Sequence, residues 1–339
     1  MKQRSLRLKR PLETAHGVVR ERELLIVTLT DADGLRAYGE AAPLKEYDGV
    51  STARVRRALE RYRPALADAQ EMNGAQAIEA CRRIEDLPQA LAAVDMALWD
   101  RAGRRAGRPV AELLTDDPAR EVIVNATLGA TDRSGAAEQA ARAVARGFEC
   151  IKVKVGLGDD AGRVAAVRAA AGPQPALRLD ANGAWDVEQA VLAIEALAPA
   201  GLELVEEPAH GLRAVREVRE RVGTRIAIDE TAAEPGALGA GAADAVCLKV
   251  GRCGGISGLI AAAALARSSG AEVYVASALD GPLGVAAALH AAAALASREP
   301  LPACGLATLG LFEGIEDELS AVRGRIALPA GPGLGVHPL

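Results

Sequence analysis

The chain has 339 residues, of which half are hydrophobic, a quarter are charged and 2% are aromatic, and its formal net charge is −5. This length and composition suit a globular protein with one large and one smaller domain. The sequence has no basic stripe and no long apolar segment, which argues against nucleic acid and membrane partners. With no apolar secretory segment and no CxxC spacing, we expect a soluble cytoplasmic protein with buried free thiols at Cys81, Cys150, Cys247, Cys253 and Cys304.

The first hundred or so residues have an α+β pattern. Residues 23–30 (ELLIVTLT) and 35–41 are strand-like, and Asp31-Ala-Asp-Gly34 between them has turn chemistry. From Ser51 to Leu114 the apolar spacing becomes helical, with Arg and Glu on the polar faces. We predict an N-terminal domain over residues 1–118.

From about Glu121 short apolar runs recur every 20 to 30 residues, each followed by an alanine-rich helical stretch. Eight runs separated by helices favour a parallel α/β barrel over residues 119–310. An open doubly wound sheet is the alternative, but it usually carries a glycine-rich phosphate loop after its first strand, which is missing here. The runs are residues 122–127, 150–155, 176–180, 202–205, 225–228, 245–250, 272–277 and 301–306.

The C-terminal segment, residues 311–339, differs from the barrel units. Residues 324–336 (GRIALPAGPGLGV) are strand-like and punctuated by proline. We predict that this segment crosses back and packs on the N-terminal domain. The glycine-rich stretch GRCGGISG at residues 251–258 is interpreted as a tight strand-to-helix turn, with a phosphate cradle as the alternative.

Acids and lysines lie at the carboxyl ends of successive runs. Asp180, Glu206 and Asp229 each end or follow a strand-like run, and three of the six lysines do so at Lys152, Lys154 and Lys249. In an α/β barrel this end of the strands is the ligand-binding face. Three carboxylates from neighbouring strands provide hard oxygen ligands that suit Mg²⁺, with Mn²⁺ as an alternative metal.

Spacing within the strands adds detail to this site. Side chains two residues apart point to the same side, so Lys152 and Lys154 share a face, as do Arg178 and Asp180. A second ammonium and a dication would lower the pKa of Lys154, which can then serve as a base in a way that arginine cannot. Lys249 would approach from across the barrel. Any one aspartate after a strand is more often a helix N-cap, and Asp186 is better placed for that role than Asp180.

The chain resembles the enolase superfamily, in the branch that contains muconate lactonizing enzymes, dipeptide epimerases and o-succinylbenzoate synthases. The motifs that carry the resemblance are IKVKVG, LDANGAW, VEEP, AIDET and CLKVGRCGGIS, with AVDMALWD, YGEAAPL and PGLGV outside the site. The resemblance implies a modified (β/α)₇β TIM-like barrel under an α+β capping domain made from both chain ends. It also implies Mg²⁺ held at Asp180, Glu206 and Asp229, and removal of a substrate α-proton by a lysine.

The resemblance also implies further site residues. Lys154 and Lys249 would be catalytic, and the residues that contact substrate or support the site would be Lys152, Arg178, Asn182, Glu230 and Ser277. Capping loops would close on a small-molecule carboxylate substrate, with His16 and Tyr47 as loop-tip candidates for which an ordinary surface role is favoured. Symmetric homo-oligomers are common for such barrels, but nothing in the sequence specifies an interface.

The reaction is harder to predict than the fold. Dipeptide epimerases usually carry Asp-x-Asp at the end of the eighth strand, whereas this chain has PACGLATLG at residues 302–310. That segment and residues 275–295 resemble o-succinylbenzoate synthase of the actinobacterial type, a dehydratase of menaquinone biosynthesis. The alternatives are an N-acylamino acid racemase or dipeptide epimerase and, from another class, a metal-free Schiff-base barrel aldolase.

Overall fold

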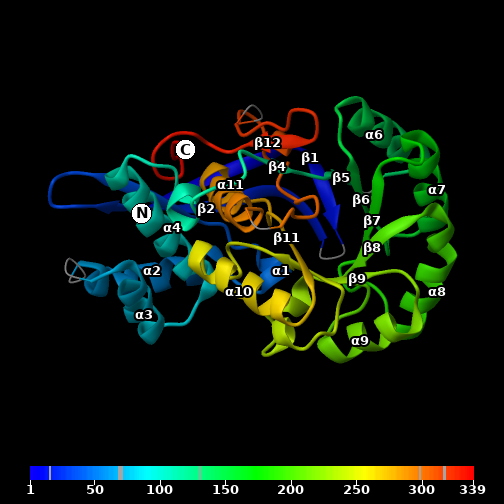
Figure 1. The fold of residues 1–339 in the computed structure, drawn as a ribbon, viewed down its shortest axis with the longest axis horizontal. Coiled ribbons are helices and arrows are strands. Elements are labelled where there is room, and N and C mark those ends of the chain that lie inside the picture. Colours follow the sequence, from blue (N-terminus) through cyan, green and yellow to red (C-terminus); the bar gives the residue numbers. More distant parts are fainter. Residues whose placement is uncertain (15–16, 68–71, 130, 298, 316–317) are drawn as a thin grey trace.

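The computed structural model describes residues 1–14, 17–67, 72–129, 131–297, 299–315 and 318–339 (Figure 1). The capping domain lies on one side and the barrel helices of residues 133–221 on the other, and both chain ends lie on the capping side.

The capping domain opens with an antiparallel sheet in the order β1-β2-β3. Its strands are β1 (Lys2–Thr14), β2 (Gly17–Thr30) and β3 (Arg36–Ala41). The predicted turn at residues 31–34 joins β2 to β3, and Gly34 has the positive φ of +86° that such a turn favours. The sequence pattern missed β1, because its hydrophobic alternation is interrupted by charged residues and a register shift between Arg7 and Leu12.

In the described residues, helices α2 to α5 of the capping domain fall within the helical spacing predicted from Ser51 to Leu114, and the short α1 precedes it. Asn73 and Gln76 form a reciprocal capping box at the start of α3, and Pro88 begins α4. A separate hydrophobic core that includes Leu25, Tyr62 and Leu91 lies inside this domain. The helices are α1 (Lys45–Asp48), α2 (Thr52–Ala67), α3 (Gly74–Ile84), α4 (Pro88–Ala106) and α5 (Val110–Leu114).

Among the described residues, the barrel sheet has seven parallel strands in sequential order, which confirms the predicted fold class. The eighth run forms only single-residue bridges, from Cys304 to Val124 and from Gly305 to Ala276, and these join the two edges of the sheet. The strands are β5 (Ala126–Leu128), β6 (Cys150–Lys154), β7 (Ala176–Asp180), β8 (Leu202–Glu206), β9 (Ile226–Ile228), β10 (Ala245–Leu248) and β11 (Glu272–Val275).

The first predicted run, residues 122–127, divides into two strands. β4 (Glu121–Ile123) pairs antiparallel with β12 (Arg325–Ala327), and only β5 joins the barrel sheet. The partner of β4 is about 200 residues away in the chain, so a local pattern gives no sign of the division.

Helices cover the outside of the barrel, and side chains begin several of them. Asp132, Asp159 and Asp186 cap α6, α7 and α8. Asp186 is thus an N-cap, as predicted, and it forms a full capping box with Gln189. The glycine-rich residues 251–255 form the predicted turn into α10. The helices are α6 (Arg133–Ala145), α7 (Asp160–Ala171), α8 (Val187–Leu197), α9 (Leu212–Arg221), α10 (Ile256–Ser268) and α11 (Pro282–Leu295), with short 3₁₀ turns η2 (Ala198–Ala200), η3 (Glu230–Ala233), η4 (Ala237–Gly239) and η5 (Leu309–Leu311).

The C-terminal segment returns to the capping domain after β12 (Figure 1). The carbonyl of Gly333 accepts a hydrogen bond of 2.9 Å from Val110, and the amide of Leu334 donates one of 2.8 Å to Asp100. A Cβ at Gly333 would lie 2.1 Å from Asp100 Oδ1, so this close approach requires glycine. α11 is buried along its whole length and contacts both α5 and β11.

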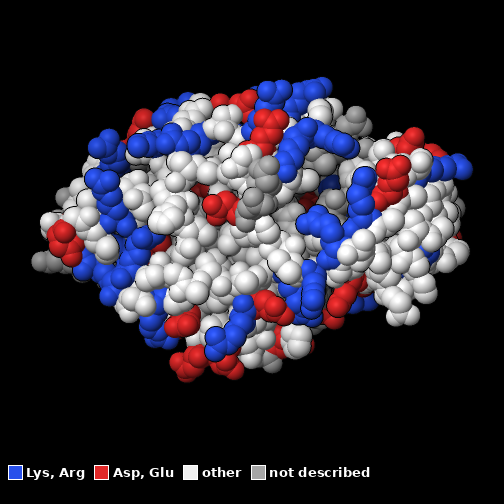
Figure 2. Space-filling view, turned by 90° about the horizontal axis from the view of Figure 1, so that it is seen from above, with Lys and Arg blue, Asp and Glu red and all other residues white. Residues whose placement is uncertain are grey.

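The surface in Figure 2 carries basic and acidic side chains interspersed around a largely uncharged centre. In the described part of the chain, no helix combines the length and the apolarity needed to cross a bilayer.

Candidate active site

Three carboxylates meet at the carboxyl ends of adjacent strands. Asp180 is the last residue of β7 and lies beside Glu206, the last residue of β8. Asp229 directly follows β9. All three are buried, and Glu206 is fully inaccessible. The structure therefore brings together the three acids that the sequence suggested as metal ligands.

Two lysines of β6 contact these acids from the same face. Lys152 Nζ donates to Asp180 Oδ2 at 2.8 Å and to Glu206 Oε1 at 2.6 Å. Lys154 Nζ donates to Asp180 Oδ2 at 2.5 Å and to Asn182 Oδ1 at 2.6 Å. The alternation of the strand thus places both ammonium groups at one side of the acidic cluster, as expected for residues two apart.

Lys249 reaches the cluster from the other side. It follows β10, and its ammonium is paired with both oxygens of Asp229 and donates to the hydroxyl of Tyr47 at 2.9 Å. Burial alone would lower the pKa of Lys249, but Asp229 together with Cys247, Tyr47 and Glu206 outweighs burial and raises it. In this arrangement Lys249 is held as a cation.

The acids and lysines of the cluster shift one another's pKa. Burial raises the pKa of Glu206 to about 7 despite Lys152, and the nearby Asp180 and Asp229 add to the increase. The pKa of Asp180 is lowered, because Lys152 and Lys154 outweigh the effect of burial. Because these buried carboxylates repel one another, a divalent cation bound among them would stabilise the site.

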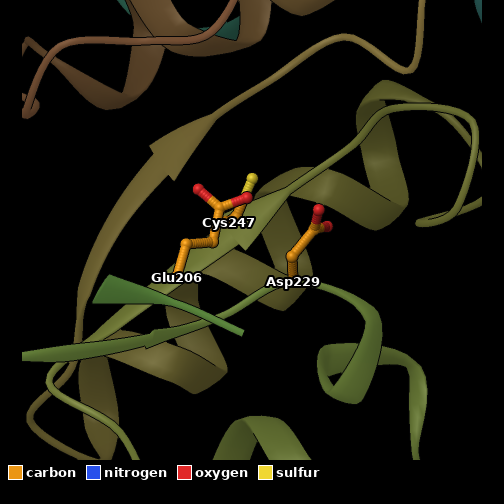
Figure 3. A group of neighbouring side chains, drawn as sticks. All are labelled: Glu206, Asp229 and Cys247. Carbon is orange, nitrogen blue, oxygen red and sulfur yellow. The ribbon is translucent and has the colours of Figure 1, made fainter. Parts of the chain in front are cut away.

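The donor set fits a hard divalent cation. Ligand atoms of Glu206, Asp229 and Cys247 lie within 4.8 Å of one another, and Figure 3 shows the three side chains pointing to the same side. Asp180 joins this group through the Lys152 ammonium that bridges it to Glu206. Burial raises the pKa of the Cys247 thiol well above its usual value, and a neutral thiol is a poor ligand for Mg²⁺. The carboxylates are thus the candidate ligands.

Tyr47 belongs to the site, a role for which the sequence gave only weak support. It lies on α1 of the capping domain, and its hydroxyl donates to Asp229 Oδ1 at 2.7 Å. Its ring centroid is 4.9 Å from both Lys249 Nζ and the Arg252 guanidinium carbon. These are cation–π distances, so the capping domain contributes directly to the cluster. His16, the other loop-tip candidate, is outside the described residues.

Asn182 and Glu230 support the Lys154 side. The Asn182 amide donates to Glu230 Oε1 at 2.9 Å while its oxygen accepts from Lys154. Asn182 has a φ of +46°, a left-handed conformation that asparagine tolerates better than most residues. Glu230 thus supports the site through Asn182, the residue that accepts from Lys154.

Glu207 has a structural role that the sequence did not reveal. Its buried carboxylate accepts hydrogen bonds from the backbone of Asp229 at 2.8 Å and of Thr231 at 3.0 Å. It therefore fixes the turn that presents Asp229. The adjacent VEEP acids differ in role because consecutive side chains of a strand point in opposite directions.

Arg178 and Ser277 lie in different places relative to the cavity. Arg178 fills the barrel interior beneath the cluster, bonded to Glu203 at 2.8 and 2.9 Å and stacked on Tyr274, and it is not among the cavity-lining residues. Tyr274 in turn donates to Glu206 Oε2 at 2.7 Å. Arg178 thus supports the acids from below. Ser277 lines the cavity, and its hydroxyl accepts a hydrogen bond from the Asp280 amide at 2.9 Å.

A cavity of about 350 Å³ opens above the cluster. Its floor includes the three lysines with Asp180 and Asp229, whereas Glu206 lies behind them and does not line the cavity. Its other walls are largely apolar and come from the β1–β2 hairpin, the segment before α1, and the segments after β11 and around residue 308. A small organic acid would fit this volume and meet the charged floor with its carboxylate.

Two curated relatives are similar to this chain over nearly its whole length, and a third is similar over about two thirds of it. The hydrophobic dipeptide epimerase of Enterococcus faecalis is 32% identical over 338 residues, covering 96% of this chain and 93% of that protein. Muconate cycloisomerase 1 of Rhodococcus opacus is 32% identical over 350 residues, covering 97% and 92%. The o-succinylbenzoate synthase of Thermobifida fusca is 43% identical over 228 residues, covering 63% of this chain and 69% of that protein.

Solved structures of an epimerase and a racemase are also similar to this protein over nearly the whole chain. The E. faecalis dipeptide epimerase complexed with Mg and the dipeptide L-Leu-L-Tyr has a TM-score of 0.90 at 29% identity, covering 98% of this chain and 97% of that chain. An N-succinyl Arg/Lys racemase from Bacillus cereus has a TM-score of 0.89 at 26% identity, covering 98% and 93%.

Two family models match the two parts of the molecule. The mandelate racemase/muconate lactonizing enzyme N-terminal domain matches residues 2–115, and the enolase C-terminal domain-like model matches residues 135–339. With the buried acids, the flanking lysines and the capped barrel, these matches place the chain in the enolase superfamily, in its muconate lactonizing enzyme subgroup.

Proposed function

We propose that this protein is a Mg²⁺-dependent carbon–oxygen lyase that dehydrates a cyclohexadiene carboxylate to 2-succinylbenzoate, a step of menaquinone biosynthesis. The observation that carries the proposal is the placement of Lys154 and Lys249 on either side of three buried carboxylates, at the floor of a cavity without an acid on its eighth-strand wall. Mn²⁺ is proposed as a substitute metal.

The lysines would divide the chemistry between them. Lys154, when neutral, would take the proton next to the substrate carboxylate, and Lys249 as an ammonium would stabilise the negative charge of the resulting enolate. The hydroxide would then leave from the same face with the proton returned by Lys154, so that water and the aromatic product result. Mg²⁺ at Asp180, Glu206 and Asp229 would supply positive charge for the substrate carboxylate.

The absence of an acidic pair near residue 305 supports dehydration over dipeptide epimerisation. A dipeptide carries an ammonium group, which needs a carboxylate partner when it is buried. Residues 301–312 contain no acidic residue. The 43% identity to o-succinylbenzoate synthases points the same way, although it spans less of the chain than the identity to the epimerases.

A second candidate is racemisation of an N-acylamino acid or epimerisation of a dipeptide. It is favoured by the matches to epimerases and a racemase along almost the entire chain. Both lysines would then exchange protons, one on each face of the substrate. A Schiff-base aldolase would not need the three carboxylates, and its test is trapping of a lysine adduct by borohydride.

The deciding experiment supplies the purified protein with Mg²⁺ and the cyclohexadiene substrate, and follows the loss of its ultraviolet absorbance. A panel of N-succinylamino acids and dipeptides is run in parallel and read by the change in optical rotation. Efficient dehydration with little turnover of the panel supports the lyase. Turnover of the panel alone would replace the lyase with the second candidate.

A further inference from the structure

Arg22 joins two separate walls of the cavity through its guanidinium group. It donates to the carbonyls of Pro43 at 2.8 Å and Ala42 at 2.7 Å, in the segment before α1. It also donates to the carbonyls of Leu279 and Ala278, both at 3.3 Å, in the segment between β11 and α11. One side chain of β2 thus holds four carbonyls from two distant stretches of backbone.

Both of these stretches face the substrate cavity. The first leads through Leu44 to Tyr47, and the second carries Ser277 and Leu279. The carbonyls that Arg22 binds belong to irregular backbone, where no helix or sheet partner is available. The distance between the two walls therefore depends on this guanidinium.

Arg22 is suited to this work by its surroundings. Only 2% of its surface is exposed, and the donors of its planar fork are spread widely enough to reach four carbonyls at once, which the compact ammonium of a lysine would not do. Leu279, one of its partners, has a φ of +62°. For a non-glycine residue this conformation persists only where the surroundings enforce it.

Glu40 fixes the next turn of the same barrel segment. Its carboxyl accepts hydrogen bonds from the amides of Gly281, at 2.6 Å, and Gly284. These amides begin α11, which has no side-chain cap of its own. A Cβ at Gly281 would lie 2.6 Å from Glu40 Oε2, so the start of α11 is shaped around this carboxyl from β3. Burial, and to a smaller extent Asp280, raises the pKa of Glu40 to about 8. The carboxyl is therefore mostly protonated at neutral pH, so that it adds little buried charge beside Arg22.

We propose that Arg22 is a positioning residue that sets the spacing between the Ala42–Leu44 and Ala276–Leu279 walls, and thereby the fit of the substrate tail. Its effect on substrate rests on the proposed function, whereas its effect on the two walls does not. Arg22 lies outside the acid–lysine cluster, so its loss should impair substrate fit more than the chemical step.

The test compares Arg22→Met, Arg22→Lys and the control Arg36→Met, an exposed arginine of β3. Hydrogen–deuterium exchange is measured on the whole protein. Arg22→Met should raise exchange about tenfold in the segments around residues 42–48 and 276–284 together. Arg22→Lys should give a smaller rise in both, and Arg36→Met none. If Arg22→Met does not fold, the Arg22→Lys result decides.

A rise in one segment alone, in neither, or uniformly through the molecule would overturn the proposal. The kinetic arm uses the best substrate found: KM should rise about tenfold in Arg22→Met while kcat stays within about threefold. A fall in kcat with unchanged KM would also overturn it. If the wild type shows no lyase activity, the proposed function fails while the exchange result on Arg22 stands.

Discussion

The hydroxyl of Tyr47 donates a hydrogen bond of 2.7 Å to Asp229, although 182 residues separate the two in the chain. Tyr47 comes from the capping domain and Asp229 from the barrel. The same hydroxyl accepts from Lys249. The capping domain therefore helps to orient an acid and a lysine of the candidate active site.

Tyr47→Phe removes these two hydrogen bonds and keeps the ring between Lys249 and Arg252. We expect kcat/KM to fall about ten- to a hundredfold, because hydrogen bonds to charged groups are worth more than neutral ones. The thermal midpoint should change little. Tyr38→Phe, which alters a tyrosine stacked on Arg104 in the capping domain, is the matched control. An unchanged kcat/KM in Tyr47→Phe would show that the hydroxyl is dispensable.

Lys154→Arg keeps the positive charge but loses the capacity to accept a proton at neutral pH. We expect kcat to drop about a thousandfold, in the range typical for loss of a general base. Circular dichroism checks that the variant is folded. Wild-type turnover by this variant would remove Lys154 as the base.

Glu206→Gln takes one negative charge from the buried carboxylates. The affinity for Mg²⁺, measured by isothermal titration calorimetry, should fall at least about tenfold, because Mg²⁺ binds charged oxygen ligands most strongly. Glu188→Gln, which alters an exposed acid paired with Arg221, should leave the affinity unchanged. Equal affinities in wild type and Glu206→Gln would place the metal elsewhere.

His290 gives the stability of the protein a pH dependence. Its Nδ1 accepts from the Ala111 amide at 3.2 Å and its Nε2 lies 3.1 Å from the Leu334 carbonyl, so the ring is held neutral. Burial lowers its pKa from 6.5 to about 4. The unfolded chain therefore binds the proton more readily, and the free energy of unfolding should fall as pH drops from 6.5 to 4, by about 3 kcal/mol.

Urea unfolding at a series of pH values measures this effect. In His290→Gln the free energy of unfolding should be lower at neutral pH, but the drop between pH 6.5 and 4 should shrink. An equal drop in both proteins would assign the acid sensitivity to other groups.

The sequence allowed the barrel and its charged centre to be predicted because both depend on local pattern. Asp180, Glu206 and Lys249 mark the ends of short apolar runs, and parallel strands bring such ends together. The roles of Arg22 and Tyr47 were not predictable in the same way, since Asp229, the partner of Tyr47, and two of the four carbonyls that Arg22 binds are more than 180 residues distant. Arg178 points to the same side of its strand as Asp180. It comes two residues earlier, however, and therefore lies deeper in the barrel, beneath the cavity, which the hydrophobic pattern does not show.

Residues 301–306 were predicted as the eighth strand but form only single-residue bridges, and the division of residues 122–127 into two strands was not predicted. Cys304 and Gly305 contribute single bridges, so the run 301–306 has apolar composition without a strand's pairing. Glu207 is distinguished from Glu206 only by the direction of its side chain and by its contacts with residues 229 and 231.

The most direct test of the enolate-forming centre is exchange of the substrate proton next to the carboxylate, followed by NMR in D₂O with Mg²⁺ present. The wild type should wash out or remove this proton from its best substrate, and EDTA or Lys154→Arg should stop the process. Product that retains the original proton, or exchange that continues undiminished in EDTA and in Lys154→Arg, would contradict the assignment of these acids and lysines.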